Sequence, residues 1–474
     1  MHILDLAGIA IYFIVMLYIG YRSSKKVQSS NDFAVAGNKI TWPILFATLA
    51  ASFLGGGASM GRAGQTFDHG YAFMFAALAF PIATMIVGVF IAPKLKKYKD
   101  AHTVGDIMEH HYGVPARIFT GVFSLLFCVG ILGAQALAIG TVFNILLDVD
   151  VLTGIIIGMA VVLAYSTMGG MWAVIQTDVI QFVMLGFFLP LTMYIGIELV
   201  GGPSNLVASI PELHFSVMGE YSWGVFLSIF IAFLLGETLV PPYTQRALAA
   251  PDSRNAKIGY TIAGAFGLIF CFVSSTIGII SFVLYPDISP DQALPTLIRN
   301  ALPVGLTGLV LASLLAVVMS TADSYLNSAS VVFVKDIYTR FYEPDCPESK
   351  KLKLERGVNF VIGLGAIAFA LTATDIIDAL LMSYALWAPT ILIPFMAGVV
   401  FDIKCNRSAI FAIITGAIVT SCWKWGPWDL QAITGLSALI AGVIGNIFVF
   451  ITSINLFSEK PNLMTSNTKK GESS

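Results

Sequence analysis

The chain has 474 residues, of which 57% are hydrophobic and 11% are charged, and its formal net charge is −2. Soluble globular domains carry about 25% charged residues, so this composition excludes an ordinary soluble protein and indicates an all-α protein that crosses a membrane many times. The near-zero net charge, with no strongly basic block, argues against nucleic acid as a partner. The five cysteines show no metal-binding or disulfide spacing.

Runs of about 20 mostly apolar residues, the length that crosses the hydrocarbon core of a bilayer, recur about thirteen times. The first run precedes its basic cluster and lacks a small-residue cleavage site, so we expect a retained helix and no cleaved signal peptide. The predicted spans are residues 4–21, 40–67, 71–92, 117–147, 150–167, 176–200, 221–246, 256–285, 302–335, 356–373, 376–401, 408–423 and 435–457.

The positions of Lys and Arg predict the orientation, because short cytoplasmic loops are enriched in positive charge. With thirteen spans and an external N-terminus, 23 of the 26 Lys and Arg residues fall on the inner side, and Arg246 is one of the 23. The exceptions are Arg62, Arg299 and Lys424. We therefore expect a cytoplasmic C-terminus, multi-pass insertion in lipid and the inner membrane of a bacterium. Residues 1–460 form one predicted membrane domain, and 461–474 form a predicted disordered tail.

Short polar segments between the spans carry two further predictions. Residues 102–112 are expected to form a separate interfacial helix whose adjacent histidines, His110 and His111, lie in solvent. The charged stretch 342–355 is expected to be a cytoplasmic loop.

Two of the predicted spans contain helix breakers at corresponding places. The second span carries glycines at 55–57, each costing about 1 kcal/mol of helix stability relative to alanine. The seventh carries Gly236 before prolines 241–242, and a proline inside a helix costs about 3 kcal/mol. Because the breaks lie five spans apart, they predict two inverted repeats, residues 40–200 and 221–401, each beginning with a broken helix. Tolerance of Gly and Pro in membrane helices is the purely structural alternative.

The ninth span is the most polar stretch at membrane depth. Ser320, Asp323, Ser324 and Asn327 follow a three-to-four residue spacing and so share one helix face. Hydroxyls, a carboxylate and the carbonyls of a broken helix are hard oxygen ligands, which suit a small cation. This pattern predicts a sodium site between the second and ninth spans. Hydrogen bonds of Ser and Thr to their own helix are the alternative.

Intramembrane acids are functional candidates because they are costly to bury. Asp178 and Glu237 join Asp323 in this class, and Arg62 lies just beyond the glycine break. Arg62 either pairs with Glu237 across the two broken helices or contacts substrate. Glu237 suits an amine, Arg62 suits a carboxylate, and an amino-acid-like zwitterion would use both.

Four stretches carry a resemblance: YSTMGGMWAVIQTDVIQ (165–181), ASFLGGG (51–57), QR (245–246) and VVMSTADSYLNSASVVFVKDIY (317–338). They resemble the sodium/solute symporter family of proline, pantothenate, sialic acid, sugar, iodide and choline transporters, and are closest to the choline branch. The resemblance covers nearly the whole chain. It implies a five-plus-five inverted-repeat fold, alternating access, sodium as the coupling ion and no other cofactor.

The resemblance also implies ion-binding residues. The principal sodium site would use the carbonyls of Ala51, Leu54 and Val317 and the hydroxyls of Ser320 and Thr321. The positions matching the second cation site of some members are Asp178, Ser320, Asp323 and Ser324. Asp323 departs from the serine or other small residue of many members, and so leaves the ion stoichiometry open.

Substrate would bind at the two helix breaks. The implied residues are Phe53, Gly56, Arg62, Glu237, Tyr243 and Trp387. Phe53 and Val240 stand where the choline branch has tryptophans, for which Tyr243 and Trp387 are partial substitutes, so choline is not assigned.

The predicted function is sodium-coupled symport of a small organic solute. A proton-coupled carrier and a non-transporting solute sensor are the alternatives, although the short tail has no room for a signalling module. An enzyme is not expected, because no base–nucleophile pair, metal-spaced His cluster or phosphate loop lies at membrane depth.

Overall fold

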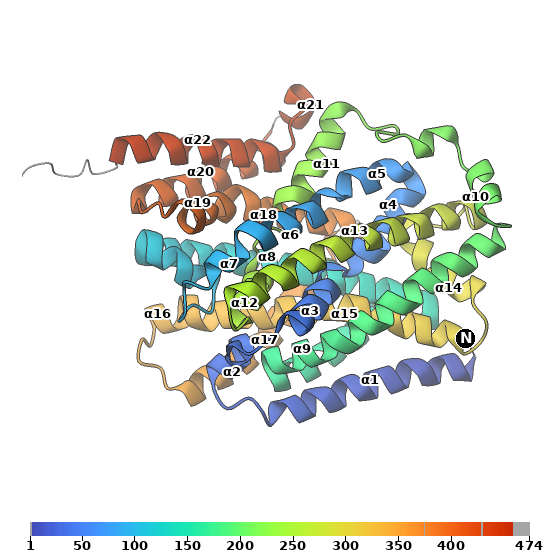
Figure 1. Cartoon of the computed structure of the whole chain (residues 1–474), viewed down its shortest axis with the longest axis horizontal. Coiled ribbons are helices and arrows are strands. Elements are labelled where there is room, and N and C mark those ends of the chain that lie inside the picture. Colours follow the sequence, from blue (N-terminus) through green and yellow to red (C-terminus); the bar gives the residue numbers. More distant parts are fainter. Residues whose placement is uncertain (1, 374, 428–429, 458–474) are drawn as a thin grey trace, which may run out of the picture.

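The computed structural model describes residues 2–373, 375–427 and 430–457, and within these ranges the chain is helical and has no strand. Most helices run roughly along the long axis of the molecule (Figure 1). The N-terminal half contains α1 (Ile3–Ser24), α2 (Ser30–Val35), η1 (Ala36–Asn38), α3 (Trp42–Phe53), η2 (Gly57–Gly61), α4 (Arg62–His69), α5 (Tyr71–Ala77), α6 (Ala79–Phe90), α7 (Ala92–Leu95), α8 (Val104–Leu147), α9 (Val151–Leu199), α10 (Pro203–Ser209) and η3 (Glu212–Phe215).

The C-terminal half repeats this mixture of long and short helices. It contains α11 (Trp223–Leu235), α12 (Pro241–Ala249), α13 (Ser253–Leu284), η4 (Pro290–Gln292), α14 (Ala293–Ala301), α15 (Leu306–Val332), η5 (Phe333–Tyr338), α16 (Thr339–Phe341), α17 (Glu348–Ala370), α18 (Ile376–Trp387), η6 (Ala388–Leu392), α19 (Ile393–Phe401), α20 (Asn406–Trp425), α21 (Leu430–Thr434) and α22 (Ala438–Phe457).

The helix lengths confirm a polytopic membrane protein. Among the described residues, nine helices are long and apolar enough to cross a membrane, or ten if the bent pair formed by 30–38 and α3 is one span. Helices α8 and α9 have 44 and 49 residues, about twice the length that one crossing needs. Glycines with positive φ, Gly113 (+77°) and Gly170 (+50°), divide them. The two arms of α9 match the predicted spans 150–167 and 176–200, while the total of thirteen stays a prediction.

The chain leaves the helical path at both predicted breaks. Helix α3 ends at Phe53, and helical turns resume in η2 and α4. Helix α11 ends at Leu235, and α12 begins at Pro241. Prolines 241–242 occupy the first turn of α12, where a missing N–H costs nothing, so they start a helix after the break. The inverted-repeat relation itself stays a prediction.

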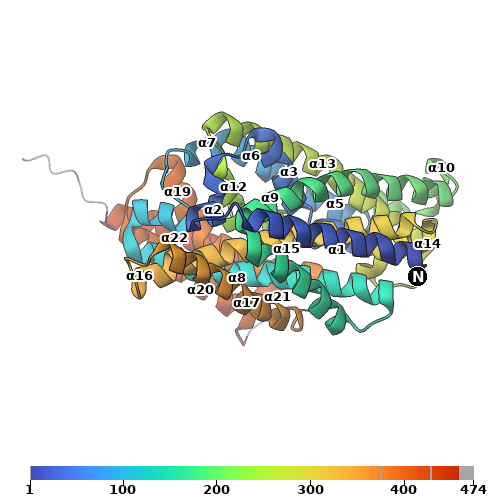
Figure 2. The ribbon, with the colours of Figure 1, turned by 90° about the horizontal axis from the view of Figure 1, so that it is seen from below.

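Helix α15 is the most deeply buried of the candidate spans. It contacts α1, α8, α9 and α12 and runs through the middle of the bundle (Figure 2). Its long polar face is therefore enclosed by other helices and shielded from lipid. The start of α1 and the end of α22 lie at opposite ends of the long axis (Figure 1).

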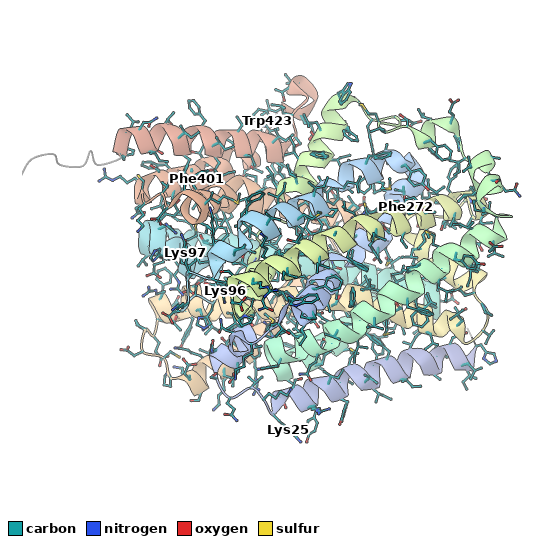
Figure 3. The ribbon with its side chains drawn as sticks, in the orientation of Figure 1. Lys25, Lys96, Lys97, Phe272, Phe401 and Trp423 are labelled. Carbon is teal, nitrogen blue, oxygen red and sulfur yellow. The ribbon has the colours of Figure 1, made fainter. Side chains whose placement is uncertain are left out.

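The molecular surface carries both basic and large apolar side chains (Figure 3). Lys25, Lys96 and Lys97, labelled in Figure 3, follow the last turns of α1 and α7. Phe272 on α13 and Phe401 on α19 are 52% and 74% exposed (Figure 3). Large exposed apolar side chains of this kind suit contact with lipid.

Two loop predictions are wrong in part. The short helix predicted over 102–112 corresponds to the first arm of α8, which begins at Val104 and is divided from the rest at Gly113 (φ +77°), and its place at the membrane interface stays a prediction. His111 is buried beneath Gly398, with a ring nitrogen 2.6 Å from the Tyr98 hydroxyl, whereas His110 is exposed. Helix α17 begins at Glu348, inside the predicted loop 342–355. The predicted tail, 461–474, lies outside the described residues.

Candidate functional site

The end of α3 faces the middle of α15. The Ser320 hydroxyl donates to the carbonyl oxygens of Ala51, at 2.9 Å, and Val317, at 2.8 Å, and the Thr321 hydroxyl donates to the Ser52 carbonyl at 2.9 Å. A helix leaves its last four carbonyls without partners inside the helix, and the break after Phe53 makes these carbonyls available at membrane depth.

The predicted principal ion ligands therefore lie together. Ala51, Val317 and Ser320 share direct hydrogen bonds, and Thr321 adjoins them through Ser52. Leu54 follows α3 with non-helical torsion angles and is buried beside them. Carbonyl and hydroxyl oxygens of this kind form a hard, uncharged ligand set.

A second buried cluster centres on Arg246. Its Nη2 atom lies 2.6 Å from Ser324 Oγ, 2.8 Å from Ser52 Oγ and 2.9 Å from Asp178 Oδ2. Its Nε atom donates to the Thr48 hydroxyl at 2.9 Å. The side chains of Arg246 and Asp178 are both 0% exposed, so Arg246 lies in the protein interior and not in an exposed connection, while its place on the inner side stays a prediction. The first turns of α12 turn it inward, onto the oxygens predicted to bind a second cation.

Asp323 adjoins this cluster without a cation of its own. Its carboxylate accepts hydrogen bonds from the hydroxyls of Tyr165 (2.8 Å), Ser324 (3.3 Å) and Thr177 (3.4 Å). None of the ion pairs among the described residues includes Asp323. The guanidinium of Arg246 therefore pairs directly with Asp178 only, and Asp323 is connected to it through the Ser324 hydroxyl.

A small cavity lies between the two helix breaks. Its volume is about 20 Å³, enough for about one water molecule. It is lined by Ser52, Phe53, Gly55, Gly57, Ala58, Arg62, Phe80, Gln135, Phe233, Glu237, Thr321, Leu380 and Tyr384. Three predicted substrate residues, Phe53, Arg62 and Glu237, therefore meet in one cavity, next to Thr321 of the ion cluster.

Three tyrosines hold Glu237. The hydroxyls of Tyr325 and Tyr243 donate to Glu237 Oε1 at 2.6 and 2.7 Å, and the Tyr384 hydroxyl donates to Oε2 at 3.0 Å. These side chains come from α15, α12 and α18. Only Tyr243 was predicted. Tyr325 directly follows the polar Asp323–Ser324 pair, a signal that points to it, whereas Tyr384 sits in an apolar run without one.

Arg62 and Glu237 do not pair in this conformation. No ion pair joins them among the described residues, and Arg62 Nη1 instead donates to the Ser274 hydroxyl at 3.3 Å. The Nε atom of Arg62 is buried and has no partner in the described structure. The contact with substrate thus stays available to Arg62.

Gly56 and Trp387, like Tyr243, were predicted to contact substrate but are not among the residues that line the cavity. The Gly56 amide donates to Gln135 Oε1 at 2.7 Å, and Gln135, a polar residue inside a predicted span, was not singled out from the sequence. Trp387 is fully buried against Phe127 and donates from Nε1 to the Thr238 carbonyl at 2.9 Å. Trp387 therefore braces the break after α11 and does not line the cavity.

The acids and histidines of the described residues form no group of three or more that could hold a metal ion. The oxygen clusters consist mainly of carbonyls, hydroxyls and single carboxylates. They therefore suit an alkali cation better than a transition metal.

Comparisons with known proteins identify a family and a fold. The profile of the sodium:solute symporter family matches residues 33–416. A sodium/glucose cotransporter of Vibrio parahaemolyticus is 27% identical, over 90% of this chain and 86% of that protein. An osmoregulated proline transporter of Bacillus subtilis is 24% identical over 96% of this chain and 95% of its own length. A high-affinity choline transporter of Drosophila melanogaster is 24% identical over 93% of this chain and 73% of its own length.

Solved structures show the same fold. A substrate-bound, outward-open Na⁺-coupled sialic acid symporter superposes with a TM-score of 0.84 at 21% identity, covering 96% of this chain and 98% of its own. A nucleobase–cation symporter in a closed conformation superposes with a TM-score of 0.62 at 14% identity, covering 93% and 98%. At these identities the likeness is one of fold.

Proposed function

Since the chain belongs to the sodium:solute symporter family, we propose that its coupling ion binds at the end of α3, beside α15. The protein is a sodium-coupled transporter of a small organic solute in a membrane. The ligands are the carbonyls of Ala51, Leu54 and Val317 and the hydroxyls of Ser320 and Thr321. The observation that carries this proposal is the Ser320 hydroxyl, which lies within 2.9 Å of two of these carbonyls.

The position of this site explains how ion binding drives transport. A cation held by oxygens from both α3 and α15 stabilises the conformation in which the broken helix rests on the buried helix. Inward movement of one positive charge releases about 2.3 kcal/mol per 100 mV, which is available for moving solute uphill. Release of the ion then lets the broken helix leave α15, as alternating access requires.

Alanine substitution of the two hydroxyl ligands tests the site. Ser320→Ala and Thr321→Ala are each expected to raise, by about tenfold or more, the sodium concentration for half-maximal uptake into proteoliposomes; tenfold corresponds to about 1.4 kcal/mol. Ser313→Ala is the matched control, because Ser313 is also buried on α15 but its hydroxyl has no partner in the described structure. Unchanged sodium dependence in both variants overturns the site.

A proton-coupled mechanism is separated by a second measurement. Uptake is measured in sodium-free proteoliposomes under an imposed pH gradient. Sodium coupling predicts no concentrative uptake under this condition. Uptake driven by the pH gradient alone would assign the coupling to protons.

We further propose a second cation near Asp323, supported by the excess of buried carboxylate over guanidinium around Arg246. The solute is proposed to bind at Phe53, Gly56, Arg62, Glu237 and Tyr243, with Trp387 as the brace behind them. The proposed setting is the inner membrane of a bacterium, with an external N-terminus. Protease removal of an N-terminal tag from intact cells, with a C-terminal tag protected, tests this orientation.

A further inference from the structure

We propose that the transported solute is a small zwitterion, whose carboxylate binds Arg62 and whose ammonium group carries at least one N–H that binds Glu237. The inference rests on the proposed function, because it assigns chemistry to the cavity between the two helix breaks. It is argued from the unused hydrogen-bonding capacity of these two buried, oppositely charged side chains.

Arg62 supplies the anion-binding half. Its side chain is 3% exposed, lines the cavity and uses Nη1 on Ser274, while Nε has no partner in the described structure. A buried donor left without an acceptor destabilises the protein, and a charged donor does so more strongly. A guanidinium edge with free N–H groups matches the two oxygens of a carboxylate. A phosphate dianion matches less well, because the carboxylate of Glu237 lines the same small cavity.

Glu237 supplies the cation-binding half. Two tyrosine hydroxyls donate to Oε1 and one donates to Oε2. An ionised carboxylate accepts about four hydrogen bonds, so one acceptor position remains, on Oε2. No lysine, arginine or histidine forms an ion pair with Glu237 within the described residues. A solute that brings a positive charge and an N–H donor completes this carboxylate.

The aromatic side chains that line the cavity further restrict the chemical class of the solute. Phe53, Phe80 and Phe233 line it together with Tyr384. Aromatic faces alone would accept a quaternary ammonium group, but such a group has no N–H for the remaining acceptor position of Glu237. A neutral sugar leaves both buried charges without a counter-charge. The structure therefore favours an amino-acid-like zwitterion over choline, a betaine or glucose.

The cavity also limits the size of the solute. Its volume of about 20 Å³ must increase for any organic solute to enter. Leu380 closes one side, since a Cβ built on Gly57 would lie 2.0 Å from Leu380 Cδ1. Leu380 is a flexible side chain, and its rotation would enlarge the cavity.

Uptake by proteoliposomes with an inward sodium gradient tests the proposal. Tritiated L-alanine and L-proline are the probes, and the unlabelled competitors are glycine, ethylamine, propionate, glycine betaine, choline and glucose. We expect uptake of at least one probe and inhibition by glycine that exceeds inhibition by any other competitor at least tenfold in concentration. Uptake of tritiated choline or tritiated glucose is measured in parallel, and uptake of either one without uptake of either amino acid overturns the proposal.

Substitution of the two charged residues links the solute groups to their partners. Arg62→Gln is expected to raise the KM for the transported amino acid at least tenfold, and to leave the weak inhibition by ethylamine, which has no carboxylate, unchanged. Glu237→Gln is likewise expected to raise the KM for the transported amino acid, and to leave the weak inhibition by propionate, which has no amine, unchanged. Arg299→Gln, which changes a partly exposed arginine away from the cavity, is the control. Equal effects of Arg62→Gln on alanine and ethylamine overturn the assignment of the carboxylate.

Failure of this inference is distinguishable from failure of sodium coupling. Sodium-driven uptake of a non-zwitterion overturns the solute class and leaves the symporter intact. Amino-acid uptake that is independent of sodium supports the solute class and overturns the coupling ion. Retention of a sodium-induced increase in thermal stability by each purified variant shows that it is folded.

Discussion

Removal of the buried cation Arg246 is expected to destabilise the protein strongly. The Arg246 guanidinium lies 2.9 Å from Asp178, and both side chains are 0% exposed. Arg246→Met keeps an unbranched side chain but leaves Asp178 and the neighbouring Asp323 buried without a counter-charge. Breaking a buried ion pair by removing one partner costs about 3–5 kcal/mol, whereas replacing both partners by uncharged groups is often nearly neutral. The double variant Arg246→Met with Asp178→Asn should therefore recover most of the loss.

The assay is thermal unfolding of the purified protein in one detergent, compared across the two single variants and the double variant. Arg299→Met is the control, because its pair with Asp148 spans 3.4 Å at 38% and 77% exposure and exposed pairs contribute about 0–1 kcal/mol. A double-mutant cycle isolates the interaction between Arg246 and Asp178. Additive losses, or equal losses for Arg246→Met and Arg299→Met, would refute the buried-pair reasoning.

Three further variants give independent outcomes. Gly278→Ala should lower the unfolding temperature, because its Cβ would lie 2.1 Å from a backbone carbonyl oxygen of α4, whereas Gly357→Ala meets nothing within 4 Å and should not. Burial raises the pKa of Asp291 to about 6, so the protonated carboxyl stabilises the folded protein below pH 4, and this stabilisation is lost as the pH rises through 6. Asp291→Asn, which cannot titrate, should reduce the change in unfolding temperature between pH 4 and pH 7. Tyr325→Phe removes one of the three hydroxyls on Glu237 and should raise the solute KM about three- to tenfold, a loss of about 1 kcal/mol, with unchanged half-saturation by sodium.

The helix breaks and the contact between the end of α3 and the polar face of α15 could be predicted because their signals are local, while the ion ligands stay a prediction. Glycines 55–57 and prolines 241–242 disfavour a helix interior whatever surrounds them, and the chain leaves helix next to both. Ser320 and Thr321 were identifiable because polar residues inside an apolar span stand out, and a break in another span supplied the missing carbonyls. Composition and spacing thus contained the elements of the cluster.

Residues whose role depends on packing could not be predicted in the same way. Arg246 follows a span and so has the sequence pattern of a cytoplasmic loop; only the direction of α12 after its two prolines places it in the core. Gln135 and Tyr384 lie in apolar runs, and which of their helix faces meets the cavity is decided by helices far away in sequence. His111 was misplaced for the same reason, since α19 covers it.

The three residues that end α3 connect the two proposed binding sites. The carbonyls of Ala51 and Ser52 face the hydroxyls of α15, while the next ring, Phe53, lines the solute cavity and packs edge-on against Tyr243 at 4.5 Å. Tyr243 in turn donates to Glu237. A cation that fixes these carbonyls also fixes the ring and, through it, the tyrosine that orients the carboxylate. Sodium binding should therefore precede and strengthen solute binding, and linkage requires the solute to strengthen sodium binding by the same factor.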